Sequence, residues 1–105
     1  MVIIETKVFT KQVVELLSDD EYKKLQAQLV ESPEAGSIIK GSGGLRKIRW
    51  VMKGRGKRGG VRIIYYWAVK DDILLMLLIY PKSEQDDLTS KQTKILRKIV
   101  EEEFR

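Results

Sequence analysis

An uninterrupted apolar run constrains the fold of this chain more than any other segment. Every residue from position 73 to position 79 is apolar, and the run lies between the pair Asp71 and Asp72 and the strand-breaking Pro81. Such a run is typical of a strand that is covered on both faces, because a strand with one face in water alternates apolar and polar residues. It has about a third of the length that a membrane-spanning helix needs. We therefore expect a central strand with other elements packed on both sides.

Two earlier segments alternate with the period of a half-buried strand. In residues 45–52, Lys47 and Arg49 share the face opposite to Ile48. In residues 61–69, one face is apolar throughout, whereas the other carries Arg62 and Tyr66. These strands, joined through the Gly-rich segment 53–60, form a hairpin that buries one face and displays the polar residues together on the other.

Helical spacing precedes the hairpin. A first strand is expected in residues 2–9, and Thr10 is predicted to be the N-cap of the helix that follows. Ser18 and Glu21 form a capping-box pattern for a second helix, which ends before Gly36.

The last helix is predicted from a second capping-box pattern, Thr89 with Gln92. Its expected buried stripe is Ile95, Leu96, Ile99, Val100 and Phe104. The order of elements is then β-α-α-β-β-β-α, an α+β fold in which helices pack on a mostly antiparallel sheet. A length of 105 residues fits a single domain, residues 1–105, with one core.

Positive charge is concentrated in the middle of the chain. Ten lysines and arginines and no acidic residue lie in residues 35–70, whereas the other 69 residues hold all 15 acidic side chains. A basic block presented by strands suits a polyanion such as RNA or DNA.

Several classes of chemistry are excluded by composition. The chain has no cysteine and no histidine, so disulfides, Cys-based metal sites, Ser/His triads and imidazole bases are excluded. Glu84, Asp86 and Asp87 could hold Mg²⁺, but we interpret Asp86 and Asp87 as turn residues before the last helix. We expect neither a metal nor a cofactor. The N-terminal residues do not resemble a signal peptide, which favours a cytoplasmic protein without a membrane segment.

The basic residues suit phosphoryl chemistry on RNA. That reaction needs a base for the 2′-hydroxyl, cations around the phosphate and a proton donor for the leaving 5′-oxygen. Lys47, Arg49 and Arg62 are candidate cations, with Lys82 just beyond the central strand and Glu84 as a candidate proton carrier. The alternative is a merely solvated polar face, although such a face usually mixes both signs of charge.

Further residues are candidates for binding RNA. Tyr66 on the outward face can stack on a base, whereas Tyr65 and Trp67 are expected in the core, and Tyr80 is left open between the two faces. The glycines of segment 53–60 let its backbone approach phosphates, unless the segment is only a soluble hairpin tip. The predicted binding set is Arg46, Lys53, Arg55, Lys57, Arg58 and Tyr66.

The segments GGLRKIRW, KGRGKRGGVRIIYYW and YPKSEQDDLT, with SPEAG after the second helix, resemble the HigB-type branch of the RelE/ParE superfamily. These are toxins of type II toxin–antitoxin pairs, and the resemblance covers nearly the whole chain. It implies a RelE-like toxin that enters the ribosomal A site, beside 16S rRNA, and cleaves mRNA there without a metal, leaving a 2′,3′-cyclic phosphate. It also implies a cognate antitoxin of helix-turn-helix type and a complex that binds operator DNA.

Position by position, the resemblance implies that Arg62 stabilises the transition state. Lys47 and Arg49 correspond to the basic pair of the preceding strand, and Lys82 to the basic residue after the last strand. Some members use a Tyr or His near the C-terminal end, which is missing here because the chain has no His and no Tyr after position 80. The role of this missing residue is then open to Lys82, Glu84 or Lys57.

Two other functions stay open at this point. A ParE-like gyrase inhibitor shares the superfamily's fold but cleaves nothing, and it has no need for cations that converge on one sheet face. The basic face could instead mainly dock an acidic segment of the antitoxin, which is compatible with catalysis.

Overall fold

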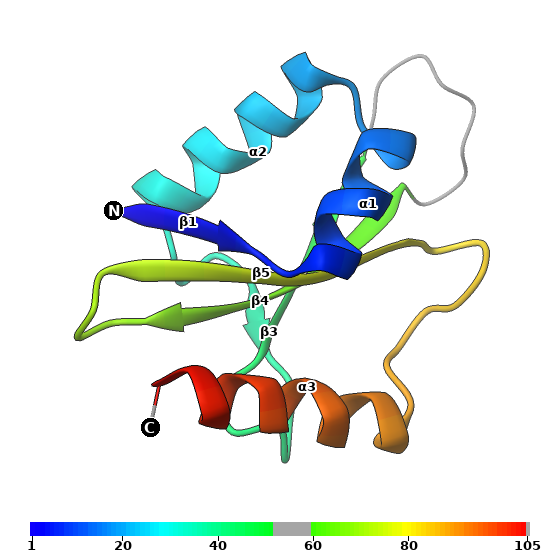
Figure 1. Ribbon diagram of the computed structural model, residues 1–105. Helices are drawn as coiled ribbons and strands as arrows, with labels where there is room; N and C mark the ends of the chain where they lie inside the picture. The colour runs from blue at the N-terminus through cyan, green and yellow to red at the C-terminus, as the bar shows by residue number, and fades with distance from the viewer. Residues whose placement is uncertain (52–59, 105) are drawn as a thin grey trace.

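The computed structural model describes residues 1–51 and 60–104. The elements, in chain order, are β1 (Val2–Glu5), α1 (Lys7–Leu16), α2 (Asp19–Glu31), β2 (Ser37–Ile38), β3 (Arg46–Trp50), β4 (Val61–Ala68), β5 (Ile73–Pro81) and α3 (Ser90–Phe104) (Figure 1). This order matches the predicted one except for the additional short strand β2. Four cations of the predicted binding set lie outside the described residues: Lys53, Arg55, Lys57 and Arg58.

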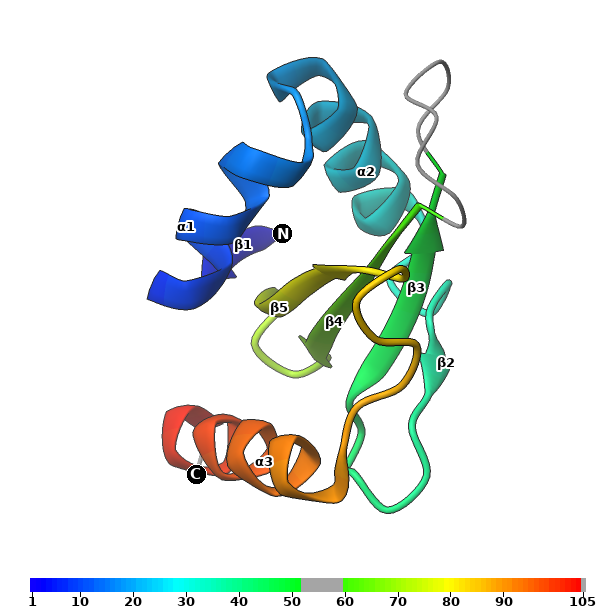
Figure 2. The same cartoon turned by 90° about the vertical axis from the view of Figure 1, so that its right-hand side faces the viewer.

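The described strands form one sheet in the order β1-β5-β4-β3-β2, in which β1 and β5 pair in parallel and the other neighbouring strands pair antiparallel. Helices α1 and α2 cover one face of the sheet and α3 covers the other (Figure 2). We call these the α1/α2 face and the α3 face. Because β5 lies inside the sheet and contributes buried residues to both faces, the predicted central strand is confirmed. In the described part of the chain, no helix has the length and hydropathy needed to cross a membrane.

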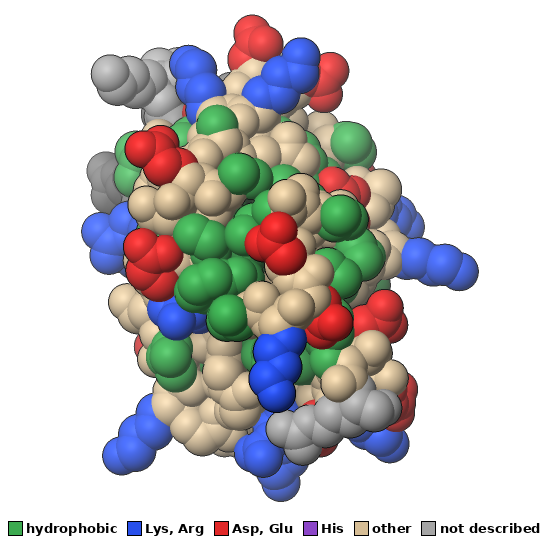
Figure 3. Space-filling model, turned by 90° about the vertical axis from the view of Figure 1, so that its left-hand side faces the viewer, with side chains coloured by type: hydrophobic (Ala, Val, Ile, Leu, Met, Phe, Trp, Pro, Cys, Tyr) green, Lys and Arg blue, Asp and Glu red, His purple; other side chains and the backbone are tan. Residues whose placement is uncertain are grey.

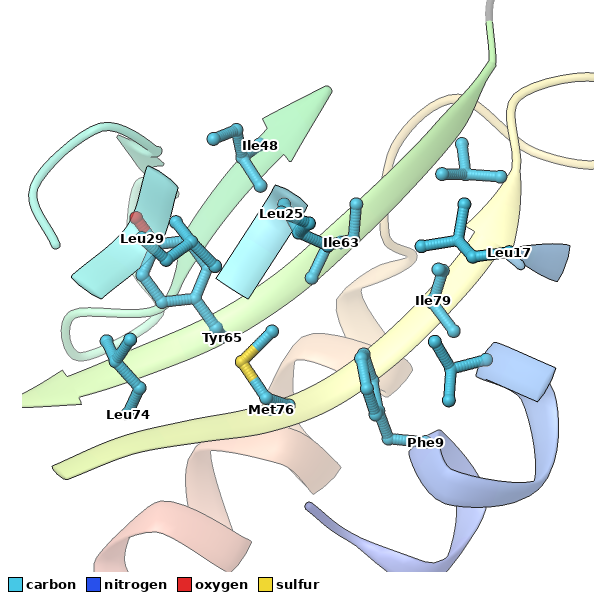
Figure 4. Close-up of a cluster of buried hydrophobic side chains, with 12 residues drawn as sticks. Phe9, Leu17, Leu25, Leu29, Ile48, Ile63, Tyr65, Leu74, Met76 and Ile79 are labelled. Carbon is cyan, nitrogen blue, oxygen red and sulfur yellow. The ribbon is translucent and has the colours of Figure 1, made fainter. Parts of the chain in front are cut away.

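The larger core lies on the α1/α2 face. Figure 4 shows Phe9 of α1 and Leu25 of α2 packed over Ile63, Tyr65 and Met76 of the sheet. All five are fully buried. Burial of such side chains contributes about 1.5–3 kcal/mol each, which explains why the apolar alternation of β4 fixes its orientation.

Strand β5 contains a β-bulge that changes which side chains face α3. Leu77 is the extra residue, because its neighbours Met76 and Leu78 pair with consecutive residues of β4. Such an insertion interrupts the alternation of a strand. Beyond it, Ile79 faces the α1/α2 side together with Met76, whereas Tyr80 faces the α3 side together with Leu77.

The first helix begins earlier than the sequence pattern predicts. Its N-cap is Thr6, whose hydroxyl accepts a hydrogen bond from the Phe9 N–H at 3.1 Å. The predicted N-cap, Thr10, lies inside the helix and donates its hydroxyl to a Glu5 carboxylate oxygen at 2.6 Å. The expected strand in residues 2–9 is therefore wrong in its second half, because Phe9 is buried on a helix and not on a strand.

The α3 face is not open along its length, contrary to prediction. Leu96 and Val100 of α3 bury its middle, and Tyr66 packs against Phe104 with ring centroids 5.6 Å apart. Tyr66 is thus part of the apolar contact with α3 and is not displayed beside the cations. Ile95, predicted in the buried stripe of α3, is 52% exposed, so that part of the prediction is wrong.

The end of the sheet at the β4–β5 turn carries surface side chains of a different kind from those of the α3 face. The N-terminus and the β4–β5 turn lie there (Figure 1), and apolar side chains gather at its centre with charged groups around them (Figure 3). Met1, Val2 and Val69 are between 40% and 63% exposed. The basic surface predicted from the charge block therefore has to lie elsewhere, at the other end of β4.

The capping box of α3 gives a stability prediction. The Thr89 hydroxyl accepts from the Gln92 N–H at 3.1 Å, and the Gln92 side chain accepts from the Thr89 N–H at 3.0 Å, as the pattern predicts. Thr89→Ala is expected to lower the free energy of unfolding by about 1 kcal/mol, since the Gln92 N–H at the helix end loses its partner. Urea denaturation measures this change. Ser90→Ala, one residue later, is the control and should change it by less than about 0.5 kcal/mol.

Candidate functional site

Strand register brings the predicted cations together on the α3 face. Arg49 of β3 lies opposite Arg62 of β4, and Arg62 lies opposite Tyr80 of β5. Residues directly opposite each other project from the same face with their Cβ atoms about 5 Å apart. Lys47 precedes Arg49 by two residues on β3 and shares its face. We call Lys47, Arg49 and Arg62 the cation cluster.

The cluster lines a hollow at the end of the sheet that α3 leaves uncovered. The hollow has a volume of about 370 Å³. Its lining residues are Ala35, Ser37, Lys47, Ile48, Arg49, Arg62 and Asp86. Arg62 is only 3% exposed, whereas Arg49 is exposed and Lys47 is half-buried. Arg62 therefore forms the floor, and Arg49 and Lys47 reach solvent at the rim.

Ala35 contributes to one wall of the hollow. It belongs to the stretch 32–36, which two side chains hold in place from the α1/α2 face. The Tyr65 hydroxyl donates to the Pro33 carbonyl at 2.7 Å and accepts from the Gly36 N–H at 2.8 Å. Arg46 donates to the carbonyls of Glu34 and Gly36 at 3.1 and 2.8 Å. A Cβ at Gly36 would lie 2.8 Å from the Tyr65 ring, so only glycine fits.

This arrangement corrects the predicted position of Arg46. The prediction placed Arg46 with the RNA-binding residues, but it lies opposite Tyr65 and hence on the other face of the sheet from Lys47 and Arg49. Its guanidinium is bonded to backbone carbonyls of the wall. Arg46 therefore stabilises the wall of the hollow from the α1/α2 face of the sheet.

Two carboxylates that the sequence interpretation treated as turn residues contact the cation cluster. They lie in the β5–α3 segment, residues 82–89, which crosses in front of β4 and β3 (Figure 2). An Asp86 carboxylate oxygen lies 3.5 Å from an Arg62 guanidinium nitrogen, and the Lys47 ammonium donates to Asp87. The hydrogen bond and charge of Lys47 lower the pKa of Asp87, which keeps this carboxylate ionised.

Tyr80 is a site residue that sequence reasoning did not assign. It is 5% exposed, and its hydroxyl donates to the Asp86 carbonyl at 3.2 Å. Burial raises the pKa of Tyr80, and Asp87 raises it further, so the phenol stays protonated and acts as a donor. Alternation along the apolar run gave no basis for placing Tyr80, because the bulge at Leu77 decides its face.

The remaining predicted residues lie around this centre. The Lys82 N–H donates to the Gly60 carbonyl at 3.1 Å, which extends the β4–β5 ladder one step beyond the pair of Val61 with Pro81. Lys82 and Glu84 are both exposed, and no ion pair involving either side chain joins described residues. The structure therefore brings Lys47, Arg49 and Arg62 together, with the backbone of Lys82 beside them.

The chemistry available to the site is electrostatic. The three cations that line the hollow can contact a phosphate group, and Arg62 can donate two parallel hydrogen bonds to its oxygens. Among the described residues, no three carboxylate, histidine or cysteine side chains are grouped as metal ligands. The protein groups at hand are thus suited to stabilising negative charge that develops on a phosphate.

Comparisons with known proteins agree with this fold. The profile of a family described as the RelE toxin of the RelE/RelB toxin–antitoxin system matches residues 1–105. The isolated E. coli RelE toxin superposes with a TM-score of 0.59 at 18% identity, over 93% of this chain and 97% of that one. A free-state E. coli RelE with two arginines replaced by alanine gives 0.60 at 18% identity, over 81% of this chain and 86% of that one. A chain of the intact E. coli RelBE toxin–antitoxin complex gives a TM-score of 0.58 at 20% identity, over 74% of this chain and 92% of that one.

Proposed function

Because the chain belongs to the RelE toxin family, we propose that it is the toxin of a type II toxin–antitoxin pair and cleaves mRNA in the ribosomal A site. Residues 1–105 act as one toxin domain in this proposal, and the protein belongs to the HigB-type branch. The ribosome and mRNA are its cytoplasmic targets, and a helix-turn-helix antitoxin neutralises it and binds operator DNA with it. The observation that carries the proposal is the position of the cation cluster. Arg49 lies opposite Arg62 and next to Lys47, and all three line a hollow on a face that is otherwise covered.

In the proposed reaction, the RNA 2′-hydroxyl attacks the adjacent phosphorus, and the 5′-oxygen of the next nucleotide leaves. Negative charge grows on the phosphate oxygens as the bond forms. Arg62, at the floor, stabilises this charge in a site that is shielded from water. Lys47 and Arg49, at the rim, bind the neighbouring phosphates and hold the strand in register.

We assign the two proton transfers of this reaction to residues of the β5–α3 segment. Lys82 and Glu84 are the two exposed titratable groups that follow the end of β5 directly. We propose that one of them takes the proton of the 2′-hydroxyl and that the other protonates the leaving oxygen. Tyr80 is excluded from a basic role because its phenol stays protonated and donates to a carbonyl.

Expression in cells followed by primer extension on cellular mRNA tests the proposal. We expect breaks inside translated reading frames that stay in phase with codons, with cyclic phosphates at the new 3′ ends. The control is the same transcript with its start codon removed, which should stay intact because no ribosome reads it. Intact mRNA together with DNA damage would instead identify a ParE-like gyrase inhibitor.

A further inference from the structure

Two of the three cations that the proposed function assigns to RNA are already paired with carboxylates of the same chain. Asp86 contacts Arg62 and Asp87 contacts Lys47. Asp86 also lines the hollow itself. The two carboxylates therefore stand in positions where phosphate oxygens of a bound RNA would contact the same nitrogens.

Hydrogen bonds within the β5–α3 segment place these carboxylates. The Tyr80 hydroxyl holds the Asp86 carbonyl at 3.2 Å, and the Gln85 amide donates to the Asp87 carbonyl at 2.9 Å. The same Gln85 amide donates to Gln92 at 2.7 Å, which connects the segment to the capping box of α3. The acidic pair is thus held over the cation cluster by the backbone of its own segment.

Breaking either ion pair costs its carboxylate little free energy. The side chains of Asp86 and Asp87 are 63% and 75% exposed, so each carboxylate regains water when it leaves its cation. The Lys47–Asp87 pair is close to water, where ion pairs contribute little to stability. In the Arg62–Asp86 pair, Arg62 is buried and the carboxylate contacts water. A phosphate chain that contacts Arg62 and Lys47 together can therefore displace both carboxylates.

We propose that Asp86 and Asp87 are internal competitors for the RNA phosphates, and so determine how tightly the cation cluster binds RNA. The inference rests on the proposed function, since it assumes that RNA binds these cations. In the absence of RNA, the carboxylates neutralise Lys47 and Arg62. An incoming RNA strand replaces them, and anions that contact only one cation displace only one carboxylate.

The affinity for a short, labelled single-stranded oligoribonucleotide, measured by fluorescence anisotropy, tests the inference. Asp86→Asn and Asp87→Asn remove the competing charge with little change in shape. Each is expected to tighten RNA binding about threefold, and the double variant about tenfold, as follows from ion pairs of this strength. Tyr80→Phe, which releases only the anchor of Asp86, should tighten binding by less than Asp86→Asn does.

Asp71→Asn is the matched control, because it removes one negative charge from the β4–β5 turn at the far end of the sheet. If it tightens RNA binding as much as Asp87→Asn, net charge alone is responsible and the inference is wrong. Unchanged or weaker binding by the Asp86 and Asp87 variants overturns it as well, since the carboxylates would then position the cations. If Lys47→Ala leaves RNA affinity unchanged, the proposed function itself fails.

Discussion

Arg62→Ala is expected to lower the rate of mRNA cleavage on ribosomes by about 10²- to 10³-fold and to abolish growth inhibition. The reason is that Arg62 forms the shielded floor of the hollow, where removal of one preorganised donor to a developing oxyanion has an effect of this size. The rate is measured by primer extension on a translated message. A folded Arg62→Ala protein that cleaves at the wild-type rate would contradict the assignment.

Two companion variants separate the chemistry of Arg62 from its charge and its packing. Arg62→Lys keeps the charge but loses the paired donors of the guanidinium, so we expect activity between those of wild type and Arg62→Ala. Lys70→Ala removes a cation from the opposite end of β4 and should leave cleavage unchanged. Because the carboxylate of Asp86 is 63% exposed, water can solvate it when Arg62 is lost, and thermal unfolding should remain cooperative.

Tyr65→Phe is expected to lower the free energy of unfolding by about 2–4 kcal/mol, because the Pro33 carbonyl and the Gly36 N–H lose their partner while both residues stay buried. This is a large fraction of the 5–15 kcal/mol that typically stabilises a small domain. Equilibrium urea denaturation measures the change. The same variant should reduce cleavage, since the stretch 32–36 contributes Ala35 to a wall of the hollow.

The neighbouring tyrosine provides the control for this prediction. Tyr66→Phe removes a hydroxyl for which no hydrogen bond joins described residues, and it keeps the ring contact with Phe104. It should change the free energy of unfolding by less than about 0.5 kcal/mol. Equal destabilisation by the two variants would show that the bonds of the Tyr65 hydroxyl do not hold the wall.

The alternation of apolar and polar residues correctly predicted which side chains of the hairpin share a face. The alternation in β3 and β4 correctly placed Lys47, Arg49 and Arg62 on one face, because burial of Ile48 and Ile63 on the other face leaves no alternative register. The N-cap at Ser18 and the complete capping box at Thr89 were also confirmed, since an N-cap needs only residues within one turn. Arg46 was misplaced because its basic character outweighed its strand parity.

The sequence by itself determined the fold class, the central strand and the face that carries the cation cluster, because hydrophobic periodicity and helix capping act over a few residues. Only the tertiary structure decided what surrounds that cluster. The bulge at Leu77 turns Tyr80 toward Arg62, and α3 covers the rest of the face. Asp86 and Asp87 reach cations that are 24 and 40 positions away in the chain. Contacts at such separations depend on register and packing between elements, which no local pattern of residues records.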